Sequence, residues 1–115
     1  MVGVIADALH TLVTAPALAL IFGSIVRGEE NARSDVDLLL IANCTFGDVV
    51  KVLHPVQEQL HREINLVLYT AAEFISRIAD KDAFIGKILA NPKLFVIGTE
   101  HDLGKLAGHS SLEGV

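Results

Sequence analysis

The chain has 115 residues and a mass of 12.3 kDa, which is the size of one domain and too small for two independent hydrophobic cores. Its residues are 51% hydrophobic and 20% charged, which excludes an intrinsically disordered chain. The formal net charge of -5 argues against a protein that holds duplex DNA by neutralising its phosphates.

Several features bear on the cellular compartment. The longest apolar run, 15–26, is interrupted by Pro16 and Gly23 and is shorter than the roughly 20 residues that cross a bilayer, so no membrane span is expected. The first ten residues carry no Lys or Arg, so the basic start of a signal peptide is missing. The single cysteine, Cys44, excludes an intrachain disulfide and a cysteine-built zinc site. A cytoplasmic protein is therefore expected.

Hydrophobic spacing predicts the elements in the first third of the chain. Apolar residues at helical spacing predict a short amphipathic helix before Pro16. An uninterrupted apolar run at 17–22, closed by Gly23, predicts a strand that is covered on both faces. The polar segment 27–34 is expected to be an exposed turn, and a second strand is predicted at 36–42.

Helix-cap residues and β-branched runs organise the remainder. Thr45, with Asp48 three residues later, begins a helix that Pro55 is expected to kink or split. A β-branched and aliphatic run at 64–69 predicts a third strand. The last third of the chain is predicted to hold a helix that begins at the capping pair Thr70 and Glu73, a helix at 82–90, a short strand at 94–97 and a last helical turn at 102–106.

The alternation of helices and strands predicts a single α/β or α+β domain over residues 1–107, followed by a disordered tail at 108–115. We expect a mixed sheet of three to four strands with helices packed mainly on one face. The large hydrophobic fraction of so small a domain also makes an apolar association surface, and hence a homo-oligomer, plausible.

The segment that carries chemistry is "FGSIVRGEENARSDVDLLLI", residues 22–41. Gly23 and Ser24 end a buried strand, so free backbone N–H groups and a hydroxyl could face an anion there, and glycine lets a phosphate approach closely. Asp35 and Asp37 project from one face of the next strand. Two hard oxygen ligands opposite an anion-binding turn are what metal-nucleotide chemistry requires, and magnesium is the expected cation.

Each of these features alone has a simpler interpretation. A Gly-Ser pair is usually only a turn, and an Asp-x-Asp pair is usually a solvated strand end in a purely structural domain. Their order, with ten residues between Ser24 and Asp35, favours a site, since both would lie at strand ends on one rim of the sheet. Adjacent carboxylates beside a hydrophobic strand also need compensation, which a metal would provide.

This segment resembles the signature of the nucleotidyltransferase superfamily of the DNA polymerase beta type, and in particular the minimal nucleotidyltransferases of prokaryotes. The resemblance implies a nucleotidyltransferase-like sheet in which Gly23 and Ser24 hold a nucleoside triphosphate, with ATP as the expected nucleotide. It also implies that Asp35 and Asp37 are catalytic and bind magnesium or manganese. The implied reaction transfers a nucleoside monophosphate to an acceptor hydroxyl and releases pyrophosphate.

The chain departs from the family pattern at the third carboxylate, whose matching place in "REINLVLY" is Asn65. An asparagine cannot accept a proton at neutral pH, although its amide oxygen could ligate a metal weakly. Glu63 is the nearby carboxylate that could replace the catalytic base. Its simpler interpretation is a solvated charge at the start of the strand. Losing a positioned base typically lowers a rate by about 10²–10⁴-fold.

Two arginines flank the polar turn and are candidate phosphate ligands. Arg27 is the better candidate, whereas Arg33 could equally form a salt bridge with a neighbouring carboxylate. The five histidines show no zinc-binding spacing.

A domain this small leaves the acceptor surface to a partner or an oligomer. The resemblance implies that such domains often act as antitoxins paired with a helical toxin of the HEPN type, which they modify or block. The alternative to an enzyme is therefore a catalytically degenerate module that binds a nucleotide or a partner, such as an antitoxin subunit, and Asn65 is the residue that favours it.

Overall fold

A computed structural model describes residues 1–23, 25–26, 28 and 35–113, with side chains to residue 107 in the last helix. The elements in chain order are α1 (Val2–Leu9), β1 (Leu18–Phe22), β2 (Val36–Ile41), α2 (Phe46–Leu60), β3 (Ile64–Tyr69), α3 (Ala71–Ala79), α4 (Ala83–Ala90), β4 (Leu94–Ile97) and α5 (Glu100–Glu113). Within these residues, no helix is long and apolar enough to span a membrane.

The four strands form one mixed sheet in the order β3-β2-β1-β4, which confirms the predicted α+β fold. β1 runs antiparallel to both β2 and β4, whereas β2 and β3 are parallel. The parallel connection from β2 to β3 is made by α2, as a parallel pair requires a crossover. β2 therefore lies inside the sheet, between β1 and β3.

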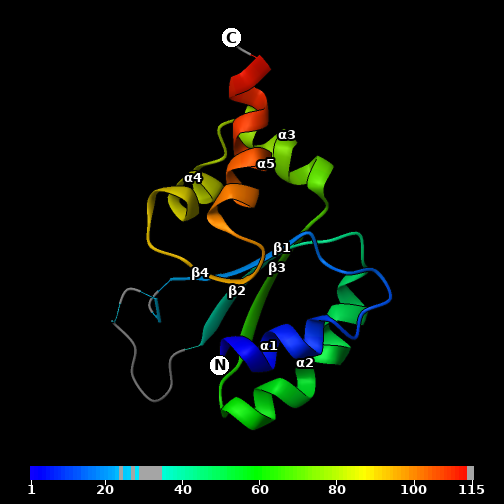
Figure 1. Ribbon diagram of the computed structural model, residues 1–115. Helices are drawn as coiled ribbons and strands as arrows, with labels where there is room; N and C mark the ends of the chain where they lie inside the picture. The colour runs from blue at the N-terminus through cyan, green and yellow to red at the C-terminus, as the bar shows by residue number, and fades with distance from the viewer. Residues whose placement is uncertain (24, 27, 29–34, 114–115) are drawn as a thin grey trace.

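Helices cover both faces of the sheet, which corrects the expectation that they pack mainly on one (Figure 1). α1 and α2 lie on one face, and α3, α4 and α5 lie on the other. The reason is visible in β2, where Leu38 and Leu40 pack toward α1 and α2 while Leu39 and Ile41 pack toward the opposite helices. Because neighbouring residues of a strand point to opposite faces, a continuous apolar run needs cover on both.

Local hydrogen bonds set where the helices begin. The Thr45 hydroxyl accepts a hydrogen bond from the Asp48 N–H at 3.2 Å, and α2 starts there. Before α3, the Glu73 N–H donates to the Thr70 hydroxyl at 3.1 Å and the Thr70 N–H donates to the Glu73 carboxylate at 2.9 Å. This reciprocal pair is the capping box predicted from the sequence.

Two helices differ from their predicted extent. α2 runs unbroken through Pro55, whose ring is exposed, while Val49, Leu53 and Val56 bury the opposite side against the sheet. That packing outweighs the hydrogen bond that proline cannot donate. α5 extends from Glu100 to Glu113, beyond the single turn expected at 102–106.

Leu39 tests the importance of the β2 core, because its side chain is fully buried at the middle of the central strand. We expect Leu39→Ala to lower the free energy of unfolding by about 2–5 kcal/mol, because it removes apolar contacts and leaves a cavity. Val13→Ala, at a fully exposed position, should change it by less than about 0.5 kcal/mol. Urea denaturation measures both, and similar values for the two variants would contradict the assigned core.

Candidate functional site

The acidic pair lies at one end of the central strand. Asp35 immediately precedes β2 and is exposed, and Asp37 is its second residue and is half-buried. Side-chain alternation puts both carboxylates on the same face as Leu39, whose side chain is fully buried. The strand therefore passes from accessible carboxylates to the closed core within a few residues.

Asn65 completes this site from the neighbouring strand. It is the register partner of Asp37 in the parallel β2–β3 pair. Its Nδ2 donates to Asp35 Oδ2 and to Asp37 Oδ1, both at 3.3 Å. One amide thus bridges both carboxylates, and its N–H dipoles offset part of the repulsion between the two negative charges.

The beginning of β3 is held in register by α2. The Ile64 N–H donates to the side-chain oxygen of Gln57 on α2 at 2.7 Å. The Val36 N–H donates to the Glu63 carbonyl at 2.9 Å. The residue after α2, His61, adopts the left-handed conformation with φ 56°, and this turns the chain into β3. These contacts place Asn65 beside the acidic pair.

Gly23 closes the site from β1, where the preceding Phe22 is the register partner of Asp37. Its φ is +84°, a conformation that favours glycine. A Cβ atom at this position would collide with Asp37 Oδ2 and lie 3.3 Å from Asp37 Cγ. The glycine expected to admit a phosphate is therefore also the residue against which the Asp37 carboxylate rests.

Glu63 lies one residue before β3, is exposed, and lines a shallow hollow at the end of α2 with His54, Glu58 and His61 among others. In the part of the chain that the structure describes, no group of three or more His, Cys, Asp or Glu side chains could hold a metal ion. The structure thus brings Asn65 to the acidic pair, whereas a role for Glu63 as a base stays a prediction. Ser24, Arg27 and Arg33 lie outside the described residues, and their roles stay predictions too.

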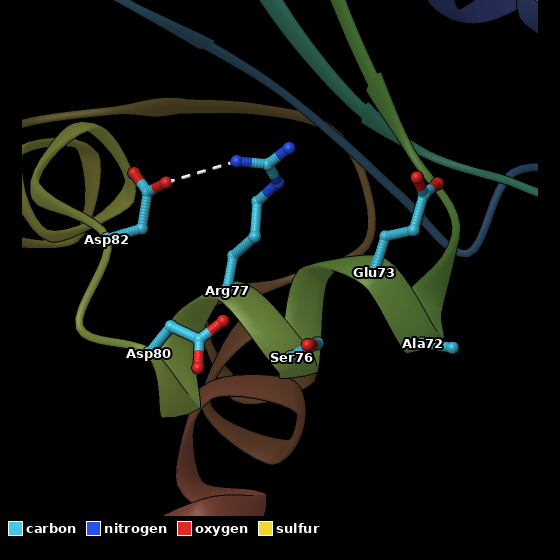
Figure 2. A pocket seen from close by; sticks show the side chains of 6 residues that line it. All are labelled: Ala72, Glu73, Ser76, Arg77, Asp80 and Asp82. Atoms are coloured by element: carbon cyan, nitrogen blue, oxygen red, sulfur yellow. Dashed lines mark hydrogen bonds and ion pairs between the residues drawn. The ribbon is translucent and has the colours of Figure 1, made fainter.

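A separate hollow lies on α3, lined by Ala72, Glu73, Ser76, Arg77, Asp80 and Asp82 (Figure 2). Three of its ionic groups, Glu73, Arg77 and Asp82, are engaged in holding helices. Arg77 Nη1 donates to Asp82 Oδ2 at 3.2 Å, and the guanidinium lies 5.1 Å from the centre of the Tyr69 ring. Hydrogen bonds from the Ile85 N–H and from Thr70 lower the pKa values of Asp82 and Glu73, respectively. The hollow is therefore a structural feature whose acidic lining disfavours a polyanion.

Sequence reasoning missed a hollow of 430 Å³ that adjoins the acidic site, lined by Phe22, Gly23, Phe84, Lys87, Ile88 and Asn91. We call it the Phe84 hollow. Phe84 is 41% exposed although its neighbour Ile85 is buried. The helical pattern of α4 signals the buried side of the helix, but only the fold shows that Phe84 meets Phe22 of β1.

Gly23 offers a direct test of its contact with Asp37, with Gly28 as the matched control. Both glycines have positive φ, but a Cβ at Gly28 would meet no atom within 4 Å. Alanine at either position should carry the cost of a left-handed conformation, about 1–2 kcal/mol. We expect Gly23→Ala to lower the free energy of unfolding by roughly 1–3 kcal/mol more, because Asp37 must move. Equal losses in urea denaturation would show that the Asp37 contact is unimportant.

Comparison with known proteins places this geometry in a family. The family described as "Polymerase beta, Nucleotidyltransferase" matches residues 5–88. No curated protein sequence matches the chain. A solved toxin-antitoxin structure with AMP-PNP is similar, with a TM-score of 0.69 and 16% identity over 98% of this chain and 86% of that chain.

Two structures of the MntA-HpeT toxin-antitoxin are also similar. A variant with two aspartates changed to glutamate has a TM-score of 0.66 and 13% identity, covering 99% of this chain and 86% of that chain. A variant with a tyrosine changed to alanine has a TM-score of 0.58 and 16% identity, covering 96% and 82%. At these identities the likeness shows the fold. Because the family match spans most of the chain and includes the acidic pair, the chain belongs to the polymerase beta nucleotidyltransferase family.

Proposed function

We propose that this protein binds a nucleoside triphosphate with magnesium, ATP being the expected nucleotide, and transfers the nucleoside monophosphate to a hydroxyl group. The observation that carries the proposal is the acidic pair: Asp35 and Asp37 share one face at the open end of β2, and Gly23 packs against Asp37. Family membership supports the reaction class, and a similar fold has been solved with AMP-PNP.

The donor set fits a magnesium ion. Mg²⁺ takes one or two protein carboxylates and completes its shell with water and substrate phosphates, so a third protein carboxylate is not required. Asp35 and Asp37 are accessible oxygen donors on one strand face, and manganese suits the same ligands. When bound, the metal offsets the negative charge of the phosphates and of the departing pyrophosphate.

The residues of the chain then position the reaction. The acceptor oxygen attacks the α-phosphorus, the bond from that phosphorus to the oxygen bridging to the β-phosphate breaks, and pyrophosphate leaves. Asn65 orients the two carboxylates but cannot take the acceptor's proton, which passes to Glu63, to a partner's side chain or to water. Phosphoryl transfer depends mainly on positioning and electrostatics, so we expect a slow reaction rather than none.

We propose that the acceptor hydroxyl belongs to a protein partner, a helical toxin of the HEPN type, to which this chain is the cytoplasmic antitoxin. Support for a protein partner comes from the similar folds that were solved as toxin-antitoxin structures.

A second candidate function is an antitoxin that binds the nucleotide and blocks its partner without transfer. The specific observation in its favour is that Asn65 replaces a third carboxylate and donates hydrogen bonds to both members of the acidic pair. An amide in this position stabilises the site without a metal and supplies no base.

Calorimetric titration with AMP-PNP and magnesium tests nucleotide binding without knowledge of the acceptor. We expect Asp35→Asn and Asp37→Asn each to weaken binding at least tenfold, since each removes a negatively charged metal ligand. Chelation of magnesium should have a similar effect. Asp80→Asn, at an exposed carboxylate beyond α3, is the matched control and should bind like the unaltered protein. A folded protein that binds no nucleotide would overturn the proposal.

ATP that carries a radioactive label on its α-phosphate distinguishes nucleotidyl transfer from blocking without transfer, because the transferred nucleoside monophosphate retains the label. Label that appears on a co-expressed helical toxin, and is absent with Asp37→Asn, supports nucleotidyl transfer. Neutralisation of the toxin without label, unaffected by Asp37→Asn, supports the second function.

Asn65→Asp tests the electrostatic role of the amide. The substitution replaces two N–H donors with a third negative charge, so we expect a lower melting temperature without metal and a larger stabilisation by magnesium than in the unaltered protein. The transfer rate should rise by about 10²–10⁴-fold if the new carboxylate acts as the base. Asn65→Ala removes the amide without adding charge and should show neither the larger magnesium effect nor a faster rate. Equal magnesium effects in the Asp and Ala variants would contradict this role.

A further inference from the structure

The Phe84 hollow shares two residues with the acidic site. Gly23, which contacts Asp37, lines it, and so does Phe22, the register partner of Asp37. Its volume of 430 Å³ is within the range of about 300–1,000 Å³ typical of small-molecule sites. A ligand that bridges the acidic pair and this hollow would pass over Gly23.

The wall of the hollow is aromatic and held in place. The rings of Phe22 and Phe84 meet edge to face, with centroids 5.7 Å apart and planes at 78°. This contact anchors Phe84 to the sheet, while 41% of the residue stays exposed. Ile88, which also lines the hollow, is buried. A rigid aromatic ring that remains accessible is a stacking surface for a flat heterocycle.

The same hollow carries a positive charge. Lys87 lies on α4, three residues after Phe84, and forms no ion pair with any residue that the structure describes. Asn91 caps the end of α4, where its Nδ2 donates to the Lys87 carbonyl at 2.7 Å. An exposed ammonium beside an aromatic ring and a glycine suits a ligand that has both a ring and a polyanionic end.

We propose that the Phe84 hollow is the nucleoside subsite: the base stacks on Phe84, the phosphates pass over Gly23 to the acidic pair, and the Lys87 ammonium faces the phosphate end. This inference rests on the proposed function and extends it, because it assigns α4 to nucleotide recognition. It also explains why a chain with so few basic residues could bind a triphosphate: a lysine meets the anion locally.

Comparison of two probes separates the parts of this subsite. AMP-PNP has a base, a ribose and a triphosphate-like end, whereas inorganic tripolyphosphate has only the last; both are titrated calorimetrically in the presence of magnesium. We expect Phe84→Ala to weaken AMP-PNP binding about tenfold or more and to leave tripolyphosphate binding unchanged. Lys87→Gln should weaken the binding of both probes.

The controls come from the opposite helix layer. Phe46→Ala on α2 removes a phenylalanine that is 55% exposed, and Lys51→Gln removes an exposed lysine of the same helix; neither should change either affinity. Phe84→Leu keeps an apolar contact with Phe22, so this variant controls for misfolding. It should still bind AMP-PNP more weakly than the unaltered protein does, with unchanged affinity for tripolyphosphate.

The outcomes distinguish the two proposals. If the unaltered protein binds AMP-PNP in a manner that requires Asp35, and both Phe84 variants bind it equally well, the nucleoside subsite is overturned and the proposed function stands. A loss of tripolyphosphate binding equal to the loss of AMP-PNP binding in the Phe84 variants would also overturn it. If the unaltered protein binds neither probe, both proposals fall.

Discussion

The site depends on one constraint: β2 must enter the centre of the sheet directly after two aspartates. From Leu38 to Ile41 every side chain of β2 is fully buried, so the strand cannot shift without exposing its core residues. The packing of this strand sets Asp35 and Asp37 on one face, at the end where the burial of the strand decreases. Core packing thus determines where the two carboxylates lie.

The neighbours of β2 complete the site from both sides. The parallel register with β3 sets Asn65 opposite Asp37, and the antiparallel register with β1 brings Phe22 opposite the same residue. Gly23 then admits the Asp37 carboxylate where any side chain would collide with it. Three strands therefore converge on a single carboxylate, and a substitution on any of them alters its surroundings.

Asn65 stabilises the acidic pair in the absence of a cation, at the expense of a potential catalytic base. A third carboxylate would increase the repulsion at the site and make it more dependent on a cation, whereas the amide donates to both aspartates at 3.3 Å. The chain gains a site that is satisfied without a ligand and gives up a potential base.

Much of the fold follows from the sequence because its signals are local. The bounds of β3 and β4 and the Thr70–Glu73 capping box follow from apolar runs and cap residues. Asn65 is singled out by the resemblance to the family motif. The distribution of the helices does not follow as readily. The consecutive leucines of β2 require cover on both faces, but they do not say which helix supplies it.

Only the tertiary structure decided the contacts between residues that are distant in the chain. The sequence by itself determined an acidic pair that enters a buried strand after a Gly-Ser pair, because that pattern is contiguous. It could not determine that Phe84 of α4 meets Phe22 of β1, or that Gly23 packs against the Asp37 carboxylate. Those contacts arise when α4 packs on the sheet and when β1 and β2 pair, and the registers and crossings that create them have no local signature.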